Sequence, residues 1–177
     1  MMKTNERYMN ALRSADTEVL EACLKDGVDV NICNGGHRVF DILLMRHCEK
    51  GMKMVLKNPK WNPNYIMSDS LSPLERALVR GREDVALQIM RHPNFKEQAR
   101  LGNGRTVAMA AVMFSAPAVY QATKRNADPN AKDNAGATLS TYIERYGQPQ
   151  TGRLVAIRQG QETYRATLQA QNEHQRA

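Results

Sequence analysis

The sequence predicts an all-α fold built from stacked helix–turn–helix units, and three observations support this prediction. Turn segments recur with a fixed period, because their last residues, at positions 31, 64, 97 and 130, are 33 apart and three of the four are Asn. Between these turns, apolar residues recur every three or four positions, which is typical of amphipathic helices. Only 6% of the 177 residues are aromatic while Met supplies ten, which favours a helical core over a β-rich one.

Each unit is expected to hold two helices. The second helix of each unit is expected in one of the apolar stretches 19–24, 52–56, 85–90 and 119–123. The clearest first helices follow Ser72-Pro73-Leu74 and Thr106-Val107-Ala108, and fainter ones follow residues 38 and 138. Pro73 fits a first helical position, where no N–H donor is needed. Ser72, Thr106 and Thr138 are expected to cap these helices.

The period identifies a family resemblance. A 33-residue helix–turn–helix period with turns such as Ala127-Asp128-Pro129-Asn130 resembles the ankyrin repeat. Segment 72–77 matches in part that family's Thr-Pro-Leu-His-x-Ala helix start. No unit has the family's His, because Asp41, Glu75 and Met109 stand at that position. The resemblance implies a solenoid of stacked helix–turn–helix units with finger loops.

The resemblance also implies domain boundaries. Residues 1–150 would form the array, and 151–177 would form a C-terminal capping helix and a polar tail. The tail has apolar positions at Leu154, Ile157, Tyr164 and Leu168. The first unit lacks an opening turn, which suits a cap. The expected units are residues 4–31, 32–64, 65–97, 98–130 and 131–147 onward.

No motif indicates catalysis. The sequence has no G-x-S-x-G, no phosphate-binding G-x-x-x-x-G-K-[ST] and no H-E-x-x-H, so we expect neither an enzyme nor a small-molecule substrate nor a cofactor. Cys33, His37, His47 and Cys48 are ligand types for zinc. In the expected unit, however, the first pair lies on a finger loop and the second pair at the far end of a helix. We therefore expect no metal site.

The composition predicts a cytoplasmic protein. The N-terminal residues lack the apolar region of a secretory signal, and no stretch approaches the roughly 18 apolar residues of a membrane-spanning helix. The three cysteines are too few and too unevenly placed for a disulfide framework. We therefore expect a reducing compartment and no contact with a membrane.

The binding surface is expected at the ends of the first helices. In the ankyrin family, the last two positions of that helix are exposed and variable. We expect a row of Arg with one apolar interruption, together with Arg38 and Arg105 at finger tips. Because a cation also favours a helix C-terminus, these Arg have a purely structural alternative. The positions are Arg13 and Ser14, Met45 and Arg46, Val79 and Arg80, Met113 and Phe114, and Arg145 and Tyr146.

The charge suggests the chemistry of the partner. The net charge of +7, with a pI near 9.5, favours acidic surfaces. We therefore expect a non-catalytic module that binds an acidic protein. A compact array suits an inhibitor, an immunity-type neutraliser or an adaptor. A bacterial or phage protein of this kind would block an enzyme of a host or of a competitor. The alternative is a nucleic-acid-binding protein that uses the same basic face. Trp61 either is an exposed contact residue or packs against a neighbouring turn.

Overall fold

The chain is helical, as expected. A computed structural model describes residues 4–34 and 36–149. In this part of the chain, one two-stranded hairpin and one 3₁₀ turn accompany the α-helices. The elements in chain order are α1 (Thr4–Ser14), α2 (Thr17–Lys25), β1 (Cys33–Asn34), β2 (His37–Arg38), α3 (Val39–Met45), α4 (Glu49–Lys57), α5 (Pro73–Val79), α6 (Glu83–Met90), η1 (Gly102–Gly104), α7 (Val107–Met113), α8 (Pro117–Thr123) and α9 (Leu139–Tyr146).

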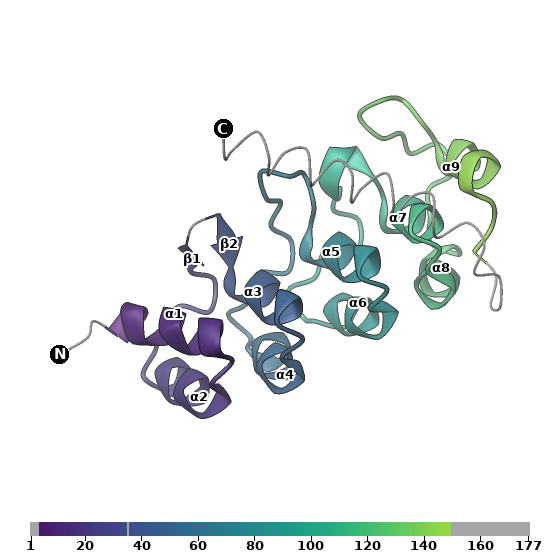
Figure 1. Cartoon of the computed structure of the whole chain (residues 1–177). Coiled ribbons are helices and arrows are strands. Elements are labelled where there is room, and N and C mark those ends of the chain that lie inside the picture. Colours follow the sequence, from purple (N-terminus) through teal and green to yellow (C-terminus); the bar gives the residue numbers. More distant parts are fainter. Residues whose placement is uncertain (1–3, 35, 150–177) are drawn as a thin grey trace, which may run out of the picture.

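The helices form two layers (Figure 1). In each unit a first helix packs against the helix that follows it: α1 on α2, α3 on α4, α5 on α6, and α7 on α8. The first helices α1, α3, α5, α7 and α9 also lie side by side in this order. The connecting loops, including β1 and β2, extend on the side of the first helices. Residues at equivalent positions of the first helices therefore form rows across the layer.

A similar turn ends every first helix. A residue one or two positions beyond the helix has a positive φ in all five units, of 56° at Ala15, 53° at His47, 68° at Gly81, 49° at Ser115 and 78° at Gly147. The first four lie in a left-handed turn closed by the same backbone bonds, whereas Gly147 has a ψ of 167° and lacks them. Only Gly adopts this left-handed conformation without steric cost. Ala15, His47 and Ser115 therefore hold a strained conformation that the packing of the two helices enforces.

Loop tips are also periodic. Positive φ angles recur at Gly36, Ser70, Asn103 and Gly136, with values of 76°, 57°, 56° and 83°. Three of these loops are closed by a backbone bond from an N–H to the carbonyl four residues later: Met67 to Leu71, Leu101 to Arg105, and Asp133 to Ala137. The β1–β2 hairpin occupies the corresponding place in the second unit.

The expected helix caps are confirmed. Ser72, Thr106 and Thr138 each accept a hydrogen bond from the backbone N–H three residues later. Pro73 occupies the first turn of α5, as expected. Because these caps satisfy amides that the helix leaves unpaired, they fix where three of the first helices begin.

The periodic Asn residues join consecutive turns. Asn31 donates from Nδ2 to the carbonyl of Lys60 at 2.8 Å and accepts the N–H of Asn62 at 2.8 Å. Asn64 repeats this pattern with the carbonyl of Asn94 at 2.7 Å and the N–H of Lys96 at 2.9 Å. An amide side chain suits this place because it both donates and accepts. The 33-residue period thus reflects a bonding requirement between neighbouring units.

Trp61 packs inside the stack, which resolves the two alternatives for this residue. Its side chain is 1% exposed. Its ring lies 5.1 Å from the ring of Phe40 and 5.3 Å from that of His92, which meets it edge-on. His92 is also buried, with Nε2 3.1 Å from the Asn58 carbonyl. The aromatic cluster therefore stabilises the contact between the second and third units.

The second-helix layer has polar links of its own. Arg82, before α6, pairs with Glu49 of α4 at 2.6 Å and with Asp84 at 2.8 Å. Glu83 accepts the N–H of Val119 in α8 at 2.9 Å. No helix in the described ranges is long and apolar enough to cross a membrane. The expected capping helix and tail, 151–177, lie outside the described residues.

Candidate protein-binding surface

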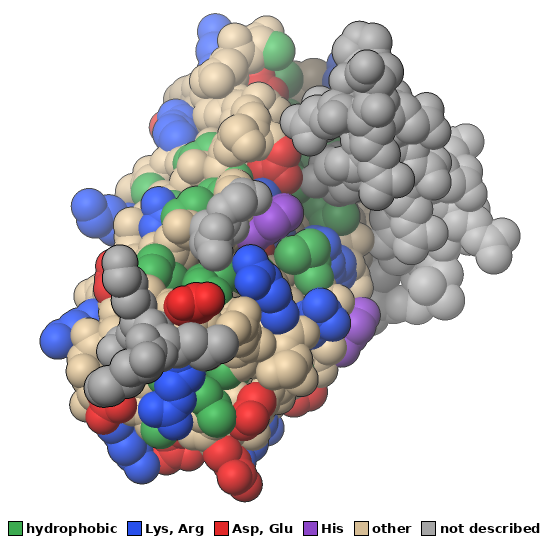
Figure 2. Space-filling model, turned by 60° about the vertical axis from the view of Figure 1, so that its left-hand side comes forward, with side chains coloured by type: hydrophobic (Ala, Val, Ile, Leu, Met, Phe, Trp, Pro, Cys, Tyr) green, Lys and Arg blue, Asp and Glu red, His purple; other side chains and the backbone are tan. Residues whose placement is uncertain are grey.

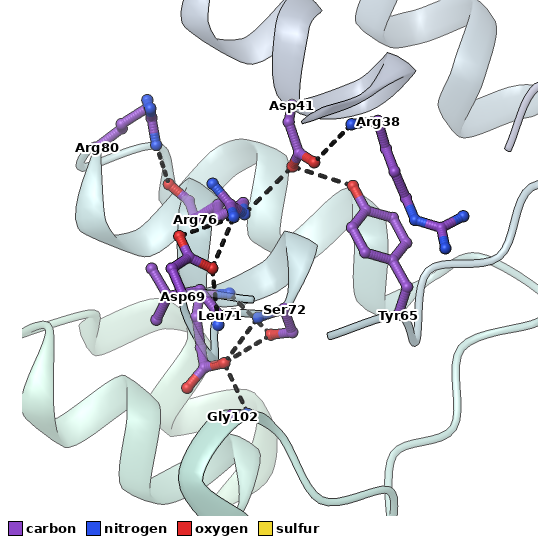
Figure 3. A network of polar contacts seen from close by, with 10 residues as sticks. Arg38, Asp41, Tyr65, Asp69, Leu71, Ser72, Arg76, Arg80 and Gly102 are labelled. Atoms are coloured by element: carbon purple, nitrogen blue, oxygen red, sulfur yellow. Dashed lines mark hydrogen bonds and ion pairs between the residues drawn. The ribbon is translucent and has the colours of Figure 1, made fainter. Parts of the chain in front are cut away.

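A buried polar network holds the first helices of the second and third units together (Figure 3). Asp41, 1% exposed, accepts a hydrogen bond from the Tyr65 hydroxyl at 3.0 Å and lies 3.4 Å from Nε of Arg76. Burial raises the pKa of the Asp41 carboxyl above its usual value, against the opposing effect of Arg76. Arg76 also pairs with Asp69 at 2.7 Å, which anchors the preceding loop to α5.

A second network joins the third and fourth units. Glu75 is fully buried and accepts hydrogen bonds from the N–H of Gly102 at 2.9 Å and from Nε of Arg105 at 2.8 Å. Ser72 donates to the same carboxylate from its N–H and its hydroxyl. Two consecutive units thus place an acid at the third helical position, where it reaches the loop of the next unit.

The expectation that Arg105 is offered to a partner at a finger tip is wrong. Its side chain is 6% exposed, and its Nη2 lies 2.7 Å from Glu75. The physical reason is that the carboxylate of Glu75, thirty positions earlier, is buried, and a paired cation lowers the free-energy cost of burying it. Arg105 therefore stabilises the stack.

Arg38 is only half-exposed and has structural contacts. Nη1 donates to the Asn31 carbonyl at 2.9 Å, and the guanidinium lies 4.6 Å from the centre of the Tyr65 ring. Such a placement over an aromatic face is a cation–π contact. Arg38 therefore holds its loop against the third unit, and only part of its side chain reaches solvent.

The positive-φ residues give a structural alignment of the first helices, and it divides the expected Arg row in two. Arg46, Arg80, Phe114 and Tyr146 directly precede the turn residue in their units, and we call them the distal row, with Ser14 at its start. One position earlier, the proximal row has a different character. It consists of Arg13, Met45, Val79, Met113 and Arg145.

Both rows reach the surface. Arg13, Arg46, Arg80 and Arg145 are exposed, while Phe114 and Tyr146 are half-buried. Met45 is 40% exposed, one of two large hydrophobic side chains that are exposed in the described part. The side chains of Arg46 and Arg145 make no hydrogen bond or ion pair within residues 4–34 and 36–149. The distal row thus changes from cationic over α3 and α5 to aromatic over α7 and α9.

Arg and Lys are segregated between the two layers, a signal that the sequence reasoning missed. The first-helix side, residues 4–15, 32–47, 65–81, 98–115 and 131–149, holds ten basic and six acidic residues, and nine of the ten are Arg. The second-helix side, residues 16–31, 48–64, 82–97 and 116–130, holds ten basic and ten acidic residues, and seven of the ten are Lys. A preference for the helix dipole alone would not distinguish Arg from Lys.

Charge is interspersed on the face that Figure 2 shows, where Lys and Arg side chains alternate with acidic and hydrophobic ones. Within the described residues, no group of three or more His, Cys, Asp or Glu side chains is placed to hold a metal ion. Cys33 lies exposed on β1, while Cys48 precedes α4 beyond the far end of α3. Neither a scan against protein-family models nor a search of curated proteins returns a match for this chain.

Proposed function

We propose that this chain is a divergent ankyrin-type array that binds an acidic partner protein, without catalysis, through its first-helix side. The observation that carries this proposal is the segregation of Arg to that side, where basic residues outnumber acidic ones. Arg is enriched in protein interfaces and Lys is depleted, because the planar guanidinium pairs carboxylates with two parallel hydrogen bonds. Such a protein would act by covering its partner, as an inhibitor, a neutraliser or an adaptor does.

Exposed apolar groups beside the Arg residues favour a protein partner over nucleic acid. Met45 precedes Arg46, and Met113 and Phe114 occupy the corresponding places in the fourth unit. Aromatic residues and Met are enriched where protein interfaces are fully buried. A nucleic-acid site favours a continuous basic stripe, whereas the distal row on the first-helix side changes from Arg46 and Arg80 to Phe114 and Tyr146.

The test compares two variants of the full chain with equal changes in charge. One is Arg46→Glu/Arg80→Glu/Arg145→Glu, on the first-helix side. Its control, Lys53→Glu/Lys57→Glu/Lys124→Glu, changes exposed residues on the second-helix side. Wild type and both variants are used to capture partners from lysate of the source cell, and the captured protein is purified and titrated against each variant after circular dichroism has shown equal helicity.

We expect the Arg variant to lose the purified partner and the Lys variant to keep it. Equal binding by both variants would show that the first-helix side is not the site. Equal loss in both would show that net charge, not position, governs binding. Capture of nucleic acid with a steep dependence on salt would favour the alternative function.

A further inference from the structure

The distal row has a direction, and this direction constrains what it can bind. Its residues over α3 and α5 are Arg46 and Arg80, whereas those over α7 and α9 are Phe114 and Tyr146. In the proximal row, Met45, Val79 and Met113 connect the two halves with apolar side chains. One end of the surface therefore offers guanidinium groups and the other offers aromatic rings.

The α7 part of the aromatic end is free of acidic side chains, whereas α9 carries the exposed Glu144 and Arg145 beside Tyr146. Helix α7 has no charged residue, and segment 98–115 as a whole has no Asp or Glu. Its Arg105 is neutralised by Glu75 in the core. On α9, the ring of Tyr146 lies 5.8 Å from that of Tyr142, so that aromatic groups continue beyond Phe114. Both Phe114 and Tyr146 contact the core while remaining half-exposed, which suits a shallow apolar contact site.

We infer that this surface binds a protein segment with carboxylates at one end and apolar side chains at the other, laid across the first helices. The inference rests on the proposed function and specifies its partner. Neighbouring packed helices lie about 8–10 Å apart, and a chain in the polyproline II conformation advances about 3.1 Å per residue with about three residues per turn, so that every third side chain faces the same side. Consecutive contact residues of the partner are therefore about three positions apart. Two carboxylates face Arg46 and Arg80, and two apolar side chains face Phe114 and Tyr146.

The probe is a fluorescent synthetic peptide whose Glu, Glu, Phe and Phe residues are each separated by Gly-Ser, titrated with the full chain by fluorescence anisotropy. A peptide with the reverse order is measured in parallel, because the direction of the bound chain is open. Two control peptides replace either both Glu or both Phe by Ser. We expect the complete peptide, in one of its two orders, to bind at least about tenfold more tightly than either control.

The decisive variant is Phe114→Arg. It places in the fourth unit the residue that α3 and α5 already have at their C-terminal caps, so the fold tolerates it there. If carboxylates alone drive binding, this third Arg increases the affinity for the complete peptide. If Phe114 is an apolar contact, the same change lowers the affinity for the complete peptide at least about tenfold. The affinity for the control peptide that keeps both Glu and lacks both Phe stays the same or rises. Phe114→Leu, which keeps an apolar side chain, should retain most of the affinity.

The outcomes separate this inference from the proposed function. Tighter binding by Phe114→Arg, or equal binding of the complete and Glu-only peptides, overturns the inference while the Arg face still stands. Failure of the complete peptide to bind in either order also overturns it. Loss of the purified natural partner in Arg46→Glu/Arg80→Glu/Arg145→Glu, with no change in Phe114→Arg, would likewise retain the proposed function and reject the apolar half.

Discussion

The junction between the second and third units and the junction between the third and fourth use the same backbone turn but different bonds. In the former, Asn64 both donates to and accepts from the next turn. In the latter, Gln98 stands at the place of Asn64, because the turn bonds of Asn58 and Trp61 recur at His92 and Phe95. Within the described residues, the side chain of Gln98 makes neither bond of the amide bridge, and the neighbouring Glu97 instead receives a 3.4 Å contact from Asn126 Nδ2.

On the loop side of the stack, the junction between the third and fourth units is the one with the stronger bonds. There the junction between the third and fourth units has the completely buried carboxylate of Glu75 and its partner Arg105, whereas Asp41 shares Arg76 with Asp69. A groove lies between turns 97–100 and 126–131, where the long contact from Asn126 to Glu97 takes the place of the amide bridge. The comparison shows that neighbouring units can be held at either edge, and that a loss at one edge is compatible with a tighter contact at the other.

The largest expected effect comes from Glu75→Ala. This change removes the buried carboxylate that pairs with Arg105 and accepts the N–H of Gly102, so we expect the free energy of unfolding to fall by about 3–5 kcal/mol. Asp41→Ala should cost less, because Arg76 retains Asp69. Denaturant unfolding followed by circular dichroism measures both. Equal losses would show that the two loop-side networks do not differ as described.

Asn64→Ala tests the turn side. Two hydrogen bonds to the next turn are lost, and we expect a decrease of about 1–3 kcal/mol in the free energy of unfolding. Gln98→Ala, at the matched position, should change it by less than about 0.5 kcal/mol, because its exposed side chain makes no bond to the next turn within the described residues. If both substitutions had the same effect, the amide bridge would not be the source of the difference.

The turn after each first helix allows a test with opposite signs. Ser115→Gly should stabilise the protein by about 0.5–1 kcal/mol. Gly removes the steric strain of the left-handed conformation, and the larger conformational entropy that Gly adds to the unfolded chain offsets part of this stabilisation. Gly81→Ala should destabilise it by about 1 kcal/mol, since a Cβ there meets no atom within 4 Å and only the backbone conformation opposes it. Thermal unfolding compares the pair. A stabilising Gly81→Ala would contradict the assigned turn.

Gln98→Asn is the smallest and most specific change. It places at this position the amide of Asn31 and Asn64, whose two bonds reach a carbonyl and an N–H of the next turn. We expect a gain of about 0.5–1 kcal/mol in the free energy of unfolding. No gain would mean that the spacing of the two turns, and not the length of the side chain, prevents the bridge.

The sequence predicts the starts of three first helices well because a cap depends on local chemistry. Ser72, Thr106 and Thr138 cap their helices as expected, since a cap involves residues only three positions apart. The side chain of Arg105 was not predicted correctly, because it points toward Glu75, a partner thirty positions away that the residues of its own loop do not indicate. The two rows, by contrast, were already present in the paired positions predicted from the sequence, with Arg13 and Arg145 first in their pairs and Arg46 and Arg80 second.

The segregation of Arg and Lys was present in the sequence but has meaning only after residues are assigned to layers. Along the chain the two types alternate without an obvious order. Once the first helices and loops are grouped, nine of ten basic residues on that side are Arg. Residue type within a charge class is therefore a signal that a repeat alignment can extract and that net charge conceals.

The side-by-side stacking of the units also determines how the molecule would respond to tension. The principal helix contacts join only elements of the same or adjacent units. A pulling force on the two ends is therefore transmitted through the junctions in series. Each unit that gives way would release 33 residues, a gain in contour length of about 110 Å. The molecule would extend in equal steps and recover them in reverse when the load falls.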